Sequence, residues 1–189
     1  MKPLRLPAAL HDNLRCPHCG ANLPVTSAEA ITCVSCGSIY PVVDGALVLL
    51  DPANPLFDAA SVETNYYGAA RANKPSGGLR GLLRAAANRA PSLGVNLKAA
   101  DNAQTFLELV RARAERPAVL IVGGGSIGEG SEAIVEATDI DLVITDVYLS
   151  AHTHAVADGH QLPFEDATFD GISAQAVLEH VLDPFQVVA

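Results

Sequence analysis

The four cysteines of this 189-residue chain fall in two pairs, Cys16-Pro17-His18-Cys19 and Cys33-Val34-Ser35-Cys36. Two C-x2-C pairs separated by thirteen residues are typical of a tetrahedral zinc site, because zinc readily takes four thiolate ligands. We therefore predict that Cys16, Cys19, Cys33 and Cys36 bind one zinc ion. Four sulfur ligands leave no open position for water or substrate, so the predicted role of the zinc is structural.

A glycine follows each cysteine pair, at Gly20 and Gly37. Glycine allows a tight turn in which backbone N–H groups can point at the sulfurs. Two disulfides, or unligated buried thiols, are the alternatives to zinc. The N-terminus has no sustained apolar segment of the secretory type, so we expect a cytoplasmic protein, and that setting disfavours disulfides. No apolar run approaches the roughly 20 residues of a membrane helix, so no membrane span is expected.

A second group of residues suited to chemistry begins with the loop Gly123-Gly124-Gly125-Ser126-Ile127-Gly128, which follows the apolar run 118–122. This pattern predicts a strand, a tight glycine turn and a helix, an arrangement that brings backbone N–H groups close to an anionic ligand. Asp146 follows a second predicted strand, 141–145, where a carboxylate can accept hydrogen bonds from ribose hydroxyls. A dinucleotide site, an S-adenosylmethionine site and a glycine turn without a ligand all remain open at this point.

The segment 156–184 discriminates between these alternatives. Asp158 follows a short predicted strand, the turn Leu162-Pro163-Phe164 comes next, and strand 169–174 leads to Leu178-Glu179-His180-Val181, predicted as the start of a helix. From about residue 118 to 183 these motifs resemble the class I methyltransferases, in particular the type-11 group. The residues from about 14 to 50, in which Asp44-Gly45 predicts a hairpin turn, resemble zinc-ribbon modules that accompany or precede some methyltransferases.

The resemblance implies S-adenosylmethionine as the cofactor. It implies that the loop surrounds the cofactor, that Asp146 binds the ribose, and that Asp158 contacts the adenine amino group. We expect Gln175 near the reacting methyl group, because open α/β sheets bind ligands at the carboxyl ends of their strands. The predicted cofactor-binding residues are Gly123, Gly125, Gly128, Asp146, Asp158 and Gln175.

The sequence departs from the family pattern in two places. Many members carry an acid two residues before the first glycine, where this chain has Ile121. The loop is also one residue longer before its last glycine than the usual pattern. Glu129 or Gln175 could compensate for the absent acid. No catalytic residue is assigned, and we favour local packing for His180 over a role as general base.

The predicted fold class is α/β. It is a Rossmann-like methyltransferase sheet, incomplete at the C-terminus, preceded by a small zinc ribbon. We expect a zinc ribbon at 1–50, a linker and helical segment at 51–98, and the N-terminal part of a methyltransferase domain at 99–189, with a helix beginning at Asp101 in a capping box with Gln104. Four of the seven strands usual in this class can be placed. A fragment, or a second chain that completes the sheet in a homo-oligomer, would account for this, since an exposed strand edge favours association.

Charge is distributed unevenly along the chain. Residues 117–189 contain twelve acids and no Lys or Arg, whereas residues 64–100 contain six basic residues and no acid. We expect methyl transfer to a small-molecule or glycan-related acceptor. A ribosomal RNA base methyltransferase is an alternative, disfavoured because the acidic half is a poor surface for phosphate. A non-catalytic zinc-ribbon module that binds a partner is the third reading.

Overall fold

The computed structural model describes residues 2–54, 57, 62, 98–128 and 130–188. The N-terminal part consists of a short 3-10 helix, η1 (Ala8–Asn13), and strands β1 (Ala30–Thr32), β2 (Ile39–Val43) and β3 (Ala46–Leu49). Helix α3 (Ala99–Arg111), β4 (Ala118–Val122), α4 (Glu132–Val135), β5 (Asp141–Asp146), β6 (Ala155–Ala157), β7 (Gly171–Ala174) and α5 (Pro184–Val187) follow. The predicted basic helix around residues 79–86 lies outside the described residues.

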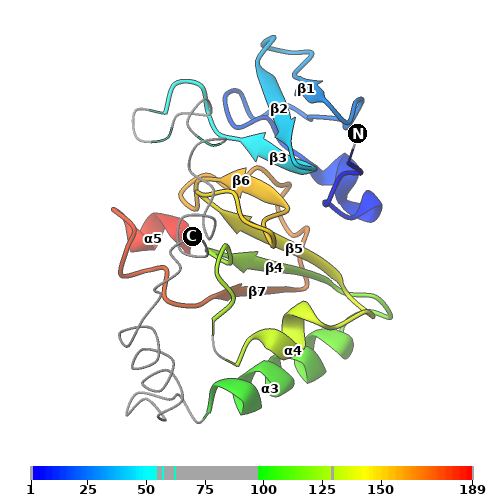
Figure 1. Cartoon of the computed structure of the whole chain (residues 1–189), viewed down its shortest axis with the longest axis vertical. Helices are drawn as coiled ribbons and strands as arrows, with labels where there is room; N and C mark the ends of the chain where they lie inside the picture. Colours follow the sequence, from blue (N-terminus) through cyan, green and yellow to red (C-terminus); the bar gives the residue numbers. More distant parts are fainter. Residues whose placement is uncertain (1, 55–56, 58–61, 63–97, 129, 189) are drawn as a thin grey trace, which may run out of the picture.

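All seven described strands form one mixed sheet in the order β1-β2-β3-β6-β5-β4-β7. The hairpin predicted at Asp44-Gly45 is confirmed, because β2 and β3 pair antiparallel with Val43 opposite Ala46. Strand β3 then pairs in parallel with β6, with Val48 opposite Val156. The cysteine-rich part, residues 14–50, therefore continues the parallel strands β6-β5-β4-β7 into one sheet through backbone hydrogen bonds (Figure 1). The α/β class and the ribbon-like N-terminal part are confirmed; the domain boundary at residue 50 stays a prediction.

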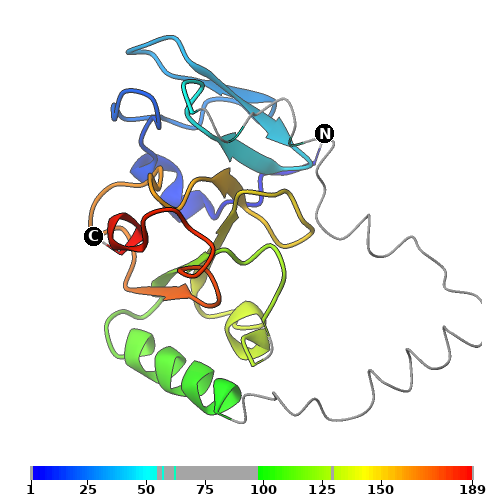
Figure 2. The same ribbon diagram turned by 90° about the vertical axis from the view of Figure 1, so that its left-hand side faces the viewer.

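The central strands are buried because both faces of the sheet are covered. Along β4, Val119 and Ile121 pack in a cluster with α3, which contributes Leu107 and Val110. The alternate residue Leu120 belongs to a different cluster. That cluster is filled largely from the N-terminal part, by Leu6, Leu10, Leu14, Leu23, Ile31 and Tyr40. Figures 1 and 2 show β1 and β2 at one end of the molecule and α3 with α4 at the other.

Three predictions about helices are wrong. Helix α3 begins at Ala99, before Asp101, and its N-cap residue Lys98 makes no side-chain capping bond, so the predicted capping box is absent. The glycine loop leads into an irregular stretch, and the next helix, α4, is a single short turn. Residues Leu178–His180 form a turn in which the His180 N–H donates to Val177, and helix α5 begins later, at Pro184.

The position at which α5 begins has a clear local cause. Asp183 caps α5, because its carboxylate accepts hydrogen bonds from the N–H groups of Phe185 and Gln186. Pro184 then occupies the first helical position, where its missing N–H costs nothing and its fixed φ suits a helix. This start signal, rather than the Leu178–Val181 motif, sets where the helix begins.

Candidate metal centre and cofactor pocket

The four cysteine sulfurs lie together in one cluster, all within 4.8 Å of one another. The Sγ atoms of Cys16 and Cys36 are 3.7 Å apart, as are those of Cys19 and Cys33. A tetrahedron with metal–sulfur bonds of about 2.3 Å has edges of about 3.8 Å, so the spacing fits a tetrahedral zinc ion. A disulfide needs sulfurs about 2.05 Å apart, and the four cysteines are free thiols. The geometry fits a metal and not the disulfide alternative.

The two cysteine pairs are folded alike. The N–H groups of Gly20 and Gly37 donate to the carbonyls of Cys16 and Cys33, and both glycines have positive φ (71° and 78°). The N–H groups of the next residues, Ala21 and Ser38, hydrogen-bond to the sulfurs of Cys19 and Cys36. The turns at these glycines thus direct backbone donors at the sulfurs, as predicted.

A buried tyrosine contacts one sulfur of the cysteine cluster. The Tyr40 hydroxyl lies 3.0 Å from the Cys16 sulfur. Burial raises the pKa of Tyr40, and its contact with Cys16 raises it further, so the phenol keeps its proton and can donate to a thiolate. Hydrogen bonds of this kind orient metal ligands and stabilise their charge.

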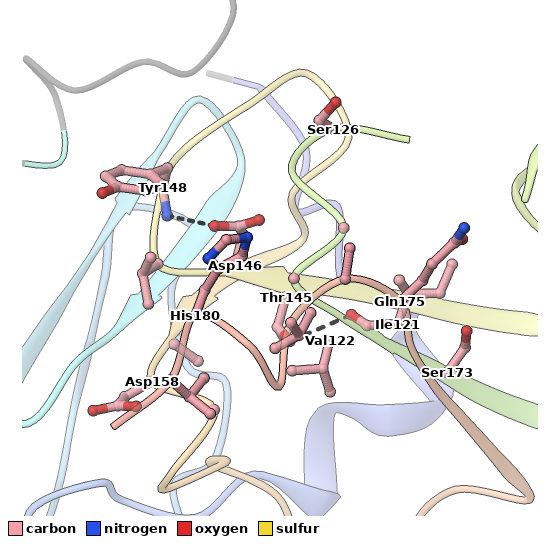
Figure 3. A pocket seen from close by; sticks show the side chains of 18 of the residues that line it. Ile121, Val122, Ser126, Thr145, Asp146, Tyr148, Asp158, Ser173, Gln175 and His180 are labelled. Atoms are coloured by element: carbon pink, nitrogen blue, oxygen red, sulfur yellow. Dashed lines mark hydrogen bonds between the residues drawn. The ribbon is translucent and has the colours of Figure 1, made fainter. Parts of the chain in front are cut away.

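The second site is a cavity of about 640 Å³ at the carboxyl ends of the parallel strands (Figure 3). Gly123 follows β4, Asp146 ends β5, Asp158 follows β6 and Gln175 follows β7, and all four line this cavity. The order of these strands in the sheet is β6-β5-β4-β7, so the four residues lie side by side at the carboxyl ends of the strands. A cavity of this size accommodates a nucleotide-sized ligand.

The glycine loop is held against Asp146. Its carboxylate accepts a hydrogen bond of 2.8 Å from the Gly125 N–H and another of 3.1 Å from the Tyr148 N–H. A Cβ on Gly125 would lie 2.7 Å from Asp146 Oδ2, and one on Gly123 would lie 2.3 Å from a methyl of Val177. Gly123 also has a positive φ of 73°. A side chain at either position would therefore have to displace Val177 or Asp146, so the loop lies tightly against the rest of the site.

Gln175 and the last glycine of the loop form another close contact. A Cβ on Gly128 would lie 2.8 Å from the Gln175 side-chain oxygen, which accepts a 2.7 Å hydrogen bond from the Ser131 hydroxyl. Ile121, where many family members have an acid, packs in the α3 cluster and also lines the cavity. Glu129, the other residue considered for compensation, lies outside the described residues. Figure 3 shows Gln175 and Asp158 on opposite sides of the cavity.

Asp158 is the most heavily hydrogen-bonded of these side chains. One carboxylate oxygen accepts from both the N–H and the Nδ1 of His160, at 2.9 and 2.7 Å, and the other accepts from Asn54 at 2.9 Å. Burial by itself would raise the pKa of Asp158, but the bonds from His160 and Asn54 outweigh it and lower the pKa. His160 Nε2 in turn accepts from the Asp183 N–H, which leaves Nδ1 as the protonated nitrogen of a neutral ring.

Three residues at this end of the cavity were not predicted: Asn54, Phe57 and His160. Phe57 and His160 line the cavity, and Asn54 bonds to Asp158 from the segment after β3. His160 stands two residues after Asp158, a local signal that could have identified it. Of the predicted residues, Gly125 is not among those that line the cavity, since its N–H faces Asp146. His180 lines the cavity with an exposed side chain.

Comparison with known protein families identifies the family of the chain. A family model described as a methyltransferase domain, of type 11, matches residues 76–189, more than half of the chain. The chain therefore belongs to this family of class I S-adenosylmethionine-dependent methyltransferases. No curated protein matches the chain significantly. Within the described residues, no helix has the length and apolar character needed to cross a membrane.

Proposed function

From its membership in the class I methyltransferases, we propose that this chain binds S-adenosylmethionine in the strand-end cavity and transfers its methyl group to an acceptor. The observation that carries the proposal is the position of two carboxylates, Asp146 and Asp158, at the ends of the neighbouring strands β5 and β6, on one cavity with the glycine loop. Carboxylates so placed suit the hydroxyls of a ribose and the amino group of an adenine. The glycine loop packs tightly against Asp146, Val177 and Gln175, which holds its backbone at the edge of the cavity.

In this proposal each end of the cavity has its own task. Asp146 accepts hydrogen bonds from the ribose hydroxyls, Asp158 accepts one from the adenine amino group, and Gln175 lies toward the methyl group. S-adenosylmethionine supplies a methyl group on a sulfonium, which an acceptor atom with a lone pair attacks as the carbon–sulfur bond breaks. The protein aligns the acceptor with that bond, and the acceptor gives up a proton where it carries one. No described side chain is assigned as the base.

We also propose that the cysteine cluster binds a structural zinc ion. The sulfur spacing and the paired glycine turns support this. For the acceptor we propose a small molecule or a glycan-related compound. The acidic character of residues 117–189 supports that class over a nucleic acid, whose phosphates such a surface would repel. The basic residues that favour RNA fall between 71 and 98, almost entirely outside the described residues.

Isothermal titration calorimetry of the whole chain with S-adenosylmethionine and, separately, with NAD tests the cofactor. We expect binding of S-adenosylmethionine and none of NAD, and we expect Asp146→Ala to weaken that binding at least tenfold, because a hydrogen bond to a charged group contributes about 1.5–3 kcal/mol. Asp166→Ala, an exposed acid away from the cavity, is the matched control. Binding of NAD without S-adenosylmethionine would refute the proposal.

A further inference from the structure

The segment after β3 connects the cysteine cluster to the nucleoside end of the cavity. His18, between Cys16 and Cys19, has its Nδ1 2.9 Å from the Asp51 carboxylate. The same carboxylate oxygen accepts the Ala53 N–H at 2.9 Å, and the Asp51 carbonyl accepts the Asn54 N–H. These bonds fold residues 51–54 into a compact turn held against the first cysteine pair. The turn ends at the residue that reaches Asp158.

The side chain of Asn54 has a defined orientation. Its Nδ2 donates to Asp158 Oδ2 at 2.9 Å, while its Oδ1 accepts the Phe57 N–H at 3.3 Å. The two ends of an amide are distinguished by their hydrogen-bond partners, and here one partner is an acceptor and the other a donor. Asn54 therefore meets Asp158 through its NH₂ group and also holds Phe57, which lines the cavity.

The bonds already made by Asp158 leave little freedom in how it can accept another. A carboxylate has about four lone-pair positions, and His160 and Asn54 fill three of them. The side chain is only 14% exposed, so it cannot turn to offer a different set. The position that remains belongs to a residue that lines the cavity, where it can accept one donor from a ligand.

We infer that Asn54 is a positioning residue, which fixes the Asp158 carboxylate so that its remaining lone pair accepts an exocyclic amino group of the bound base. This inference rests on the proposed function and adds a specificity-determining contact to it. The cysteine-rich part of the chain thus takes part in selecting the nucleoside, through a residue 104 positions before Asp158.

A second contact anchors Asp158 to the same cysteine pair. The Gln161 side chain, three residues after Asp158, donates to the carbonyl of Pro17, between Cys16 and Cys19. The segments that carry Asn54 and Asp158 are therefore both fastened to residues 16–19. A metal bound by these cysteines would hold the two hydrogen-bonding partners in register, because both segments share one anchor.

The inference is tested by calorimetry with two probes, S-adenosylhomocysteine and S-inosylhomocysteine, in which a carbonyl oxygen replaces the amino group of the base. The wild-type chain should prefer the adenine form by about 10- to 100-fold, the range of a hydrogen bond to a charged acceptor. Asn54→Ala should reduce this preference to less than about threefold, since Asp158 Oδ2 then loses the bond that orients it, while the His160 bonds hold only Oδ1. A residue with only a structural role would weaken both ligands equally and leave the preference unchanged.

Two further variants complete the experiment. Asn54→Asp keeps the shape of the side chain but sets two carboxylates together, so it should weaken S-adenosylhomocysteine more than Asn54→Ala does. Asn102→Ala, on the exposed side of α3, should behave as wild type. If wild type prefers the adenine form and both Asn54 variants keep that preference, the inference is wrong while the proposed function stands. If wild type binds neither probe, both fall.

Discussion

The cysteine cluster and the strand-end cavity are built in opposite ways. The cluster draws its four ligands from 21 consecutive residues, Cys16 to Cys36, and each cysteine pair repeats the same glycine turn. The cavity is lined by residues from Phe57 to Leu182. Its important hydrogen bonds join residues far apart in sequence, such as Asn54 with Asp158. A local motif fixes the first site, whereas the whole sheet is needed to assemble the second.

The difference implies that a substitution in the cysteine cluster should disturb the cavity, whereas a substitution in the cavity should not disturb the cluster. Loss of the cluster should loosen the cavity, because the N-terminal part covers one face of the sheet and reaches Asp158. Loss of a cavity side chain should leave the cluster intact, because the cysteine turns are held by their own backbone bonds. Four predictions examine this asymmetry.

The largest effect should come from Cys33→Ser. Cys33 is fully buried among the apolar side chains of the N-terminal part that cover one face of the sheet. A structural zinc site contributes on the order of 10 kcal/mol to folding. We expect loss of bound zinc and a fall in the free energy of unfolding of more than about 5 kcal/mol. Metal analysis and denaturant unfolding measure the two quantities.

The control for this variant is Ser35→Ala, an exposed residue between Cys33 and Cys36. It should retain both zinc and stability. A Cys33→Ser protein that keeps one equivalent of zinc and the wild-type stability would mean that the cysteine cluster does not hold the fold together through a metal.

The second prediction concerns the joint between the two regions. The ring Nδ1 of His154 accepts the Ile144 N–H. The backbone N–H of His154 donates to the Ile144 carbonyl, and its backbone carbonyl accepts the N–H of Leu47 in β3. Burial, together with the nearby charge of Arg5, lowers the pKa of His154 to about 4. In the unfolded chain this imidazole takes up a proton near pH 6.5, whereas in the folded chain it does so only near pH 4. The free energy of unfolding should therefore fall as the pH drops from about 6.5 to 4.

Protonation of His154 should lower the free energy of unfolding by about 2–3 kcal/mol over that interval. His154→Asn separates it from other groups, because the Asn oxygen can accept the same N–H but does not titrate. Denaturant unfolding at pH 7 and pH 4.5 should show a smaller difference for the variant than for wild type. Equal pH dependence in the two proteins would rule out His154 as the source.

The third prediction confines damage to the cavity. In Gly125→Ala the new Cβ would lie 2.7 Å from Asp146 Oδ2 and displace the carboxylate. We expect S-adenosylmethionine affinity to fall by about tenfold or more, equivalent to about 1.4 kcal/mol, with zinc content unchanged. Asp166→Ala, an exposed residue outside the cavity lining, is the control for calorimetry. Loss of zinc in Gly125→Ala would contradict the proposed direction of coupling.

The same asymmetry decides what the sequence could predict. The cysteine cluster follows from spacing alone, since each pair supplies its own turn and its own donors. Strand positions could also be predicted, because the apolar runs that form β4 and β5 are long enough to mark buried strands, and the short β6 lies directly before Asp158. Pairing of β3 with β6 was not accessible, because nothing in either short strand specifies a partner more than a hundred residues away.

The ends of helices and the polar contacts between distant residues also could not be predicted from the sequence. The family-like Leu178–Val181 motif indicated a helix, but the capping side chain of Asp183 sets the start of α5 later. Asn54 was missed because its importance depends on Asp158, 104 residues on, and no local pattern distinguishes it from any other turn asparagine. These features depend on tertiary contacts that exist only once the sheet has formed.

The smallest effect should come from a pair outside both regions. Arg116 donates to Asp141 at 2.7 Å and to the carbonyls of Thr138 and Ile140, which ties the connection between α3 and β4 to the start of β5. Lysine cannot make this set of bonds, since it lacks the planar fork, so Arg116→Lys should cost about 1 kcal/mol or less. Zinc content and S-adenosylmethionine affinity should match wild type, because neither the cysteine turns nor the cavity contact Arg116. A change in either quantity would show that coupling is a general response to lost stability, and would remove the basis for a specific path through Asn54.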